Sequence, residues 1–368
     1  MTKTSTDDID EMLRMIDEAE NDLGYQDNYN EQPPNDIVAF NELRSCSDLV
    51  RMHKDKQLII DPDFQRDVVW SPATQTRFID SLVKQLPIPS MCISYDYNTD
   101  TRLMIDGLQR ISTIIRFLSE NEWKLSDLDD IDPHISGRTV KYIREKNKNL
   151  YSRIENLTIP ITVLRCDNSK KAHMEYLFTI FHRLNTQGNK LSNQEIRNCI
   201  YSGKFNSYLK EIVGLEEFRN LFGLEKNKTY RFMYEELLLR IIAHYSSYES
   251  YSGKLSSYLN EFMGKYRHVE YEQIQNEFSP VRETLHIIYN NILDGQEFQR
   301  QSKATTEALF VGIARNIEIV KNLDNASLKK KYEELRNDAL FSVDALKEGL
   351  AAKDKVVNRL NRATEIFA

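Results

Sequence analysis

The stretch RLMIDGLQRISTIIRFLS, residues 102–119, contains the most informative pattern in the chain. It begins with an apolar run that is typical of a β-strand, passes through Asp106 and Gly107, and continues with apolar residues at helical spacing. The pattern predicts a strand over 102–105 and a helix over 111–119. A strand that runs directly into an amphipathic helix favours an α+β fold for this part of the chain.

Similar short elements are predicted on both sides of this stretch. Runs rich in Ile, Leu, Val or Tyr, bounded by Pro, Asn or Asp, predict strands over 57–60, 90–95 and 157–164. Apolar residues at helical spacing predict a helix over 74–84. From residue 171 the spacing is helical almost to the end. The helices predicted there span 231–245, 256–266, 269–293, 303–323, 327–338 and 343–367.

One further helix carries its own start signal. In the segment LSNQEIRNCIYSG, Ser192 is followed three residues later by Glu195, which is the spacing of a capping box. Gly203 is the expected C-terminal stop of this helix.

These patterns predict three regions. Residues 1–35 form an acidic tail with a short amphipathic helix, 36–190 an α+β domain, and 191–368 an all-helical domain. The net charge of −7 belongs to the tail, because its two basic and ten acidic residues leave the rest of the chain near neutrality. Whether the tail docks or stays disordered is open, and a neutral body neither requires nor excludes nucleic-acid contact.

Several classes of protein are excluded by composition. The 368 residues are 40% hydrophobic and 29% charged, and no apolar run approaches the ~20 residues that cross a bilayer. The first residues lack the pattern of a secretion signal, so we expect a cytoplasmic protein without membrane contact. The four cysteines lack any C-x-x-C spacing and are expected to be reduced and buried. P-loop, dinucleotide and hydrolase-elbow motifs are missing from the sequence.

The strand–helix junction in IDGLQRIST, residues 105–113, is the first candidate for chemistry. Backbone N–H groups in the first helical turn have no intrahelical partner and lie at the positive end of the helix dipole, which suits phosphate. Arg110 adds donors for phosphate oxygens, and Asp106 is a candidate to bind Mg²⁺ or act on a water molecule. A simpler interpretation stays open, in which Asp106 is the N-cap and Arg110 forms a surface ion pair.

Two more polar clusters flank this junction. In PDFQRDVVW, residues 62–70, Gln65 and Arg66 lie between aromatic residues that we expect to pack in the core. Arg66 then suits ligand recognition, although pairing with an internal carboxylate fits equally well. FHRLNTQGNKLSNQE, residues 181–195, contains Asn185 and a histidine, His182, for which a structural role is favoured.

In this order the segments resemble the N-terminal domain family of the GmrSD-type restriction endonucleases. The shared patterns are P-x-x-QR-x-x-x-W, lPIP, iDGqQRlTt and vF-x-rlN-x-x-G-x-x-Ls-x-x-E-x-R. They correspond here to residues 62–70, 86–89, 105–113 and 180–197, followed by RFMYEELLLR at 231–240. The resemblance covers roughly residues 45–245, and the ordered set is far more specific than any single motif.

The resemblance implies a ParB/sulfiredoxin-like fold for the N-terminal domain, ahead of the all-helical C-terminal domain that the periodicity predicts. It also implies binding and hydrolysis of a nucleotide, with the base left open, together with Mg²⁺ at Asp106. The implied catalytic residues are Asp106, Gln109 and Arg110, and the implied nucleotide-binding residues are Gln65, Arg66, Gly107, Arg110 and Asn185. Leu108 departs from the pattern, because it replaces the first Gln of DGQQR and makes hydrolysis less secure than binding.

The resemblance further implies a role in prokaryotic defence, in which DNA is cut by a separate HNH-type nuclease. The seven histidines of this chain show no such pattern, so the nuclease is expected to be a partner. Near the end, Lys355, Arg359 and Arg362 fall near one helical face and are weak candidates for DNA contact, although solvated helix faces look the same. The leading hypothesis is an NTP-hydrolysing regulator or sensor of a restriction system. The alternative is a non-catalytic DNA- or protein-binding module of the same fold.

Overall fold

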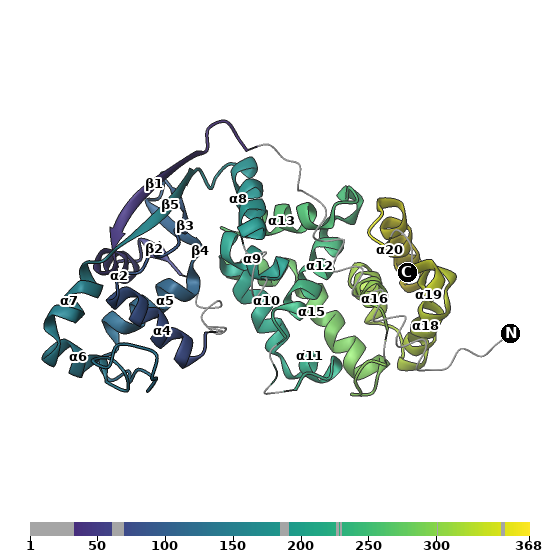
Figure 1. The fold of residues 1–368 in the computed structure, drawn as a ribbon. Coiled ribbons are helices and arrows are strands. Elements are labelled where there is room, and N and C mark those ends of the chain that lie inside the picture. The colour runs from purple at the N-terminus through teal and green to yellow at the C-terminus, as the bar shows by residue number, and fades with distance from the viewer. Residues whose placement is uncertain are drawn as a thin grey trace. The chain divides into compact units, whose positions relative to one another are not determined.

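The structure is a computed structural model that describes residues 33–60, 70–184, 191–225, 228, 230–299, 301–346 and 350–368. The described residues up to Leu191 form one compact unit, and those from Ser192 onward form another. We call them the sheet unit and the helical unit, and each is described by itself. Figure 1 labels their helices and strands.

The sheet unit is built on one mixed sheet of five strands in the order β1-β5-β3-β4-β2. The strands are β1 (Val38–Ser45), β2 (Leu58–Ile59), β3 (Met91–Asp96), β4 (Thr101–Asp106) and β5 (Thr158–Cys166). β1 pairs with β5 and β3 with β4 in antiparallel fashion, whereas β3–β5 and β2–β4 are parallel. A mixed sheet of parallel and antiparallel strands, combined with helices, confirms the predicted α+β class. The four predicted strands are confirmed, and β1 is an additional one.

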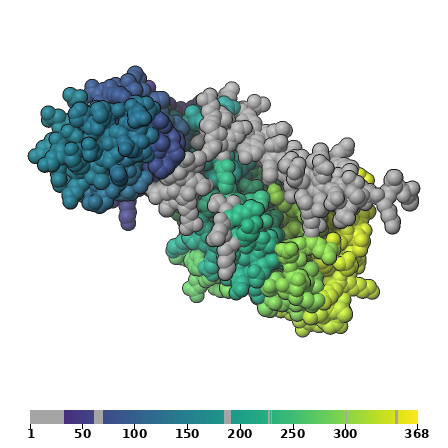
Figure 2. Space-filling model, turned by 60° about the horizontal axis from the view of Figure 1, so that its bottom comes forward, coloured from purple at the N-terminus to yellow at the C-terminus, as the bar shows by residue number. Residues whose placement is uncertain are grey.

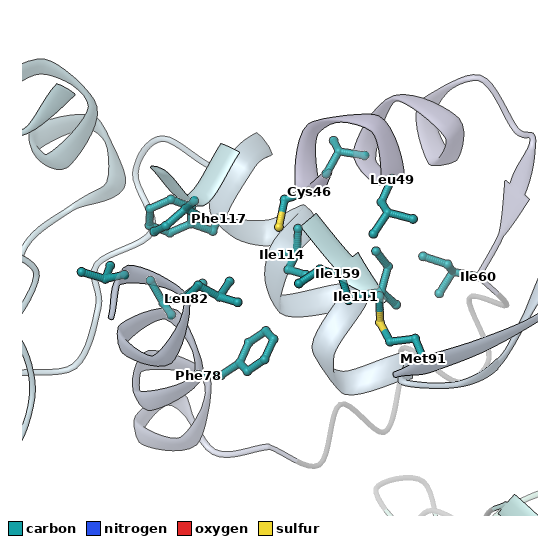
Figure 3. Close-up of a cluster of buried hydrophobic side chains, with 14 of the residues drawn as sticks. Cys46, Leu49, Ile60, Phe78, Leu82, Met91, Ile111, Ile114, Phe117 and Ile159 are labelled. Atoms are coloured by element: carbon teal, nitrogen blue, oxygen red, sulfur yellow. The ribbon is translucent and has the colours of Figure 1, made fainter. Parts of the chain in front are cut away.

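Helices enclose the apolar core of this unit. They are α2 (Cys46–Lys54), α4 (Pro72–Val83), α5 (Leu108–Ser119), α6 (Val140–Lys146), α7 (Lys148–Asn156) and α8 (Lys171–Leu184). Leu49 of α2, Phe78 of α4 and Ile111 of α5 point toward one another beside Met91 of β3 (Figure 3). Because Ile111 and Met91 are fully buried, the start of α5 is tied to the start of β3.

The helical unit, drawn in green to yellow in Figure 2, contains only helices and their connections among its described residues. Its helices are α9 (Asn193–Ile200), α10 (Lys204–Gly214), α11 (Glu216–Leu221), α12 (Met233–Ser247), η1 (Tyr248–Ser250), α13 (Leu255–Tyr266), α14 (Tyr271–Glu277), α15 (Ser279–His286), η2 (Ile287–Ile292), α16 (Lys303–Arg315), α17 (Ile317–Val320), α18 (Asn325–Asn337), η3 (Ala339–Phe341), α19 (Val343–Leu346) and α20 (Lys353–Phe367). α12 and α20 both pack against α16.

Several predicted helices are divided in the structure. The helix predicted over 269–293 ends at Glu277, and Pro280 stands in the first turn of a new helix, where its missing N–H leaves no bond unmade. The predicted helix over 303–323 is interrupted at Asn316, and that over 343–367 is two helices, α19 and α20. The capping box at Ser192 and Glu195 is confirmed. The prediction for Gly203 is wrong, because α9 ends at Ile200 and Gly203 is instead the N-cap of α10.

Two predictions from composition can be compared directly with the structure. All four cysteines are buried and unpaired as disulfides. Among the described residues, no helix combines the length and the apolar character that a membrane span requires. The amphipathic helix predicted in the acidic tail lies outside the described residues.

Candidate functional site

The junction between β4 and α5 begins with an irregularity in the sheet. Cys92 of β3 pairs with Asp106, whereas the next residue, Ile93, pairs with Met104, so β4 contains one extra residue at Ile105. A bulge of this kind bends a strand and changes the direction of the side chains beside it. Asp106 therefore leaves the sheet immediately after a bulge, which is a frequent arrangement next to functional sites.

Gly107 follows and turns the chain from strand to helix. Its φ of 104° and ψ of 14° lie in the left-handed region, where residues with a side chain are strained. A Cβ atom at this position would lie 2.6 Å from Cγ of the fully buried Met91. Backbone conformation and packing therefore both require glycine here.

α5 starts directly after this turn without a side-chain cap. Gly107 is its N-cap residue, and the Gly107 carbonyl accepts the first intrahelical bond from Ile111 N at 2.9 Å. A helix of 12 residues with this kind of start directs the positive end of its dipole toward the Asp106–Gly107 turn. Backbone N–H groups at such a helix start have no intrahelical partner.

Arg110 points back across this turn. Its guanidinium donates to Asp106 Oδ2 at 2.8 Å and to the carbonyls of Pro89 and Ser90 at 2.5 and 3.3 Å. The simpler interpretation of the sequence is thus half right. The ion pair exists, but the N-cap is Gly107 and not Asp106, because the bulge and the glycine move the helix start by one residue.

Gln109 and Leu108 have different surroundings. Trp70 N donates to Gln109 Oε1 at 3.3 Å, and the Trp70 ring packs edge-on against Phe78. The last residue of the 62–70 motif therefore contacts the 105–113 motif. Leu108 is partly buried against the apolar core, so its position serves packing where a Gln side chain would be polar.

The carboxylate of Asp106 has one titratable neighbour on β3. Burial raises the pKa of the Cys92 thiol to about 12, and the charge of Asp106 adds to this effect. Cys92 is consequently a thiol at neutral pH and is inert as a nucleophile. Within the described ranges, no three His, Cys, Asp or Glu side chains are grouped closely enough to hold a metal ion. Asp106 is the carboxylate at this junction, and carboxylate oxygens are ligands that Mg²⁺ accepts.

The remaining motif residues separate into described and undescribed positions. Gln65, Arg66 and Asn185 lie outside the described residues, and His182 is in the last turn of α8. Further along the same motif, Glu195 closes the capping box and forms a bidentate pair with Arg231, through bonds of 3.1 and 2.7 Å. The third motif thus extends from the sheet unit into the helical unit.

The weak DNA-binding face on α20 is corrected by the structure. Arg359 is only 6% exposed and donates to the Leu350 carbonyl at 2.6 Å. Arg362 is paired with Asp338 at 2.7 Å and with Glu334 at 3.0 Å. Lys355 and these two arginines are all on α20, but tertiary packing buries Arg359 and pairs Arg362 with carboxylates. They do not form an open basic surface.

Comparison with known proteins identifies the segment that contains this junction. Residues 46–202 match the family model of the GmrSD restriction endonuclease, N-terminal domain. The resemblance seen in the motifs is thereby confirmed over these residues. No curated protein and no solved structure gives a significant match to the chain.

The GmrSD-type segment begins at α2 and ends just after α9. It contains β2 to β5, the bulge, Gly107 and the Asp106–Arg110 pair. The matched model is named for a restriction endonuclease, and a role of this chain in a restriction system is a proposal. The ParB/sulfiredoxin-like arrangement of the sheet stays an expectation.

Sequence reasoning missed the buried cations of the helical unit. Arg197 ends the third motif and Arg240 ends RFMYEELLLR, and both are buried, at 1% and 5% exposure. Their position at the ends of two recognised motifs was the one signal in the sequence that these arginines matter. Hydrophobic periodicity could not reveal their burial, because it does not apply to charged residues.

Proposed function

We propose that the GmrSD-type segment binds a nucleotide at the β4–α5 junction and serves as the nucleotide-dependent regulator of a DNA restriction system. The observation that carries the proposal is the uncapped start of α5 behind the left-handed Gly107. The missing Cβ lets a phosphate approach the backbone, and the helix dipole favours its negative charge.

Asp106 and Arg110 supply two charges beside this turn. Their side chains are 37% and 15% exposed, so the pair is open to solvent on one side. On arrival of a nucleotide with Mg²⁺, the carboxylate would bind the cation and the guanidinium would turn toward phosphate oxygens. Gln109, already held near the 62–70 motif through Trp70, would orient the ligand or an attacking water. Gln65, Arg66 and Asn185 are proposed as further nucleotide contacts.

Nucleotide binding is tested by thermal unfolding of the full chain with ATP, GTP, CTP or UTP and Mg²⁺. A ligand that binds the folded state at 100 times its Kd adds about 2.7 kcal/mol to the free energy of unfolding. We expect at least one nucleotide to raise the melting temperature. A melting temperature that none of the four changes, at millimolar concentration, contradicts the proposal.

Hydrolysis is tested separately by phosphate release. Asp106→Asn should reduce release at least tenfold, because the Mg²⁺ ligand is lost. Glu120→Gln is the matched control, since Glu120, the C-cap residue of α5, forms an i,i+4 pair with Arg116 at 3.0 Å. Equal turnover in Asp106→Asn and Glu120→Gln would show that the junction is not the hydrolytic site.

The alternative function is a binding module without turnover, and Leu108 favours it. Because Leu108 packs on the core, one polar position of the DGQQR pattern is absent from this chain. This alternative predicts a nucleotide-dependent rise in melting temperature with no phosphate release. Restoring the pattern with Leu108→Gln would then produce turnover. In either case DNA cleavage is assigned to a partner nuclease, which co-purification with an HNH-type protein would test.

A further inference from the structure

Two adjacent helices of the sheet unit, α6 and α7, contain a group of cations that the proposed nucleotide site does not use. α6 packs against α7, and both are labelled in Figure 1. Residues 138–156, which span the two helices, contain six basic and two acidic residues, so this stretch has a net charge of +4. Its cations are Arg138, Lys141, Arg144, Lys146, Lys148 and Arg153.

All six cationic residues are exposed, because the apolar residues of the two helices face inward. Val140 and Ile143 of α6 and Ile154 of α7 are buried in the core of the sheet unit. When one side of a helix is buried in this way, its polar and charged positions remain in contact with solvent. The cations are therefore on the solvent side of α6 and α7.

The six cations differ from most others in the sheet unit, because they have no carboxylate partner. Cations of this unit that do lie within 4.0 Å of a carboxylate include Arg44, Arg51, Arg77, Lys84, Arg102, Arg110, Arg116, Lys170 and Lys171. In the part of the chain that the structure describes, none of the six cations in 138–156 forms an ion pair within this distance. Burial and ion pairing, which removed the basic face expected on α20, are thus both absent here.

An acidic loop lies beside the start of this basic stretch. Residues 127–132 contain four aspartates, and Asp127 accepts a hydrogen bond from Ser136 Oγ at 3.0 Å, two residues before Arg138. The loop therefore weakens the positive potential near Arg138, and the most positive part begins after it. We call the five cations of that part the α6–α7 surface, namely Lys141, Arg144, Lys146, Lys148 and Arg153.

The composition of this surface favours a nucleic acid over a protein or a membrane. Tyr142, at 41%, is the one exposed large hydrophobic residue in 138–156, and the Arg138 guanidinium lies over its ring at 5.0 Å from the centroid. Protein interfaces have an apolar core, and helices that lie on membranes expose an apolar face. Protein–DNA interfaces are instead polar and rich in positive charge.

We propose that the α6–α7 surface binds the phosphate backbone of duplex DNA. The choice of duplex DNA as the polyanion rests on the proposed function in DNA restriction. Lys and Arg contacts to phosphates fix the position of a protein on the duplex but do not read its bases, so binding is independent of sequence. Each neutralised phosphate releases counterions, and the affinity therefore falls steeply with salt.

Fluorescence anisotropy of the full chain with a short labelled DNA duplex, without nucleotide, tests the surface. We expect the logarithm of the binding constant to fall linearly with the logarithm of the salt concentration between about 50 and 200 mM. The expected slope is about −4, which corresponds to four or five neutralised phosphates. Absence of DNA binding at the lowest salt concentration overturns the proposal.

A double variant locates the binding on α6. Lys141→Gln combined with Arg144→Gln should weaken DNA binding about tenfold and reduce the steepness of the salt dependence by about 2, since two phosphate contacts are lost. Lys330→Gln combined with Lys353→Gln is the matched control. It removes the same charge from two exposed lysines of the helical unit that also form no ion pair within the described residues. Its affinity should stay within about twofold of wild type.

Equal losses in the two double variants would assign DNA binding to the overall charge and overturn the proposed surface. Competition identifies the partner. Duplex RNA, polyglutamate and vesicles of equal parts phosphatidylserine and phosphatidylcholine should each displace the labelled duplex less effectively than unlabelled duplex DNA. A competitor that displaces it more effectively than DNA contradicts the assignment to duplex DNA.

The result can be separated from that at the β4–α5 junction. The Lys141→Gln, Arg144→Gln variant should keep the wild-type melting temperature and any nucleotide-dependent rise in it, because both residues are exposed and lie outside the junction. A chain that no nucleotide stabilises, but whose DNA affinity falls in this variant, contradicts only the nucleotide site. A chain that nucleotide stabilises, but whose DNA affinity is unchanged in this variant, contradicts only the α6–α7 surface.

Discussion

The sheet unit and the helical unit both pair arginine with carboxylate, but in opposite environments. Asp106 and Arg110 are 37% and 15% exposed at the end of a strand, with water on one side. Arg240 and Glu307 are 6% and 7% exposed between α12 and α16. Water screens the first pair, so its charges can be redirected to a ligand at little cost. The second pair is fixed, because separating it would leave a buried charge uncompensated.

The largest effect is expected from breaking the buried pair. Glu307→Ala should lower the free energy of unfolding of the helical unit by about 3–5 kcal/mol, because Arg240 is left buried without its partner. Urea denaturation followed by circular dichroism measures this loss. Both tryptophans, Trp70 and Trp123, belong to the sheet unit, so their fluorescence provides an internal control.

A double variant sharpens the same test. Arg240→Met combined with Glu307→Leu should recover most of the lost stability, since apolar residues often replace a buried pair without loss. A double variant as unstable as Glu307→Ala would mean that packing, and not the uncompensated charge, causes the loss.

Next in size is the turn before α5. Gly107→Ala should destabilise the sheet unit by roughly 2–4 kcal/mol, from the left-handed backbone and the clash with Met91 together. Tryptophan fluorescence during urea denaturation measures this loss of stability. Gly214→Ala in α10 is the control for the substitution itself, measured by circular dichroism because Gly214 belongs to the helical unit. Apart from its chain neighbours and its own helix backbone, no atom lies within 4 Å of the added Cβ, so the change should be neutral or slightly stabilising.

A pH effect of intermediate size is expected from His244. Burial lowers the pKa of His244 to about 3 in the folded chain, whereas the unfolded residue titrates near 6.5. The unfolded state therefore binds the proton first, and stability present above pH 6.5 is lost as the pH falls toward 3. The expected slope is about 1.4 kcal/mol per pH unit.

The His244 contribution can be isolated by substitution. His244→Phe keeps a ring against Tyr258, with which His244 stacks at 5.4 Å between centroids. Between pH 6.5 and 5, where most carboxylates are still ionised, the variant should lack the slope seen in wild type. Equal slopes in both proteins would assign the pH dependence to other groups.

The smallest effect on stability is expected at the exposed pair. Asp106→Asn should change the free energy of unfolding of the sheet unit by less than about 1 kcal/mol, as is usual for partly exposed ion pairs. Measured by tryptophan fluorescence, a loss of 3 kcal/mol or more would mean that Asp106 is structural. The contrast between the two units would then fail.

The elements with clear periodicity were predictable from the sequence, and those defined by tertiary contacts were not. Strands near 91–96, 101–106 and 158–166 follow their apolar runs. β1 was missed because its sequence, VAFNELRS, mixes apolar and charged residues along a mostly exposed edge strand. The prediction of one long helix over 269–293 was wrong because it overlooked Pro280. Proline is favoured in the first turn of a helix, and Pro280 lies in the first turn of α15.

The candidate site shows the same division. The order Asp-Gly followed by helical spacing was sufficient to locate the junction and the Asp106–Arg110 pair. The bulge at Ile105 was not predictable, because it depends on the register between β3 and β4. Burial of Arg359 was equally hidden, since helical spacing shows which residues share a face and not what covers that face.

The sequence by itself determined the α+β and helical regions, the capped start of α9, the glycine turn before α5 and the family resemblance. These features depend on neighbours within a few residues, through backbone propensity and side-chain periodicity. Only the tertiary structure decided which charges are buried and which are paired with carboxylates. Burial and electrostatic environment arise from residues far apart in the chain, so local patterns contain no record of them.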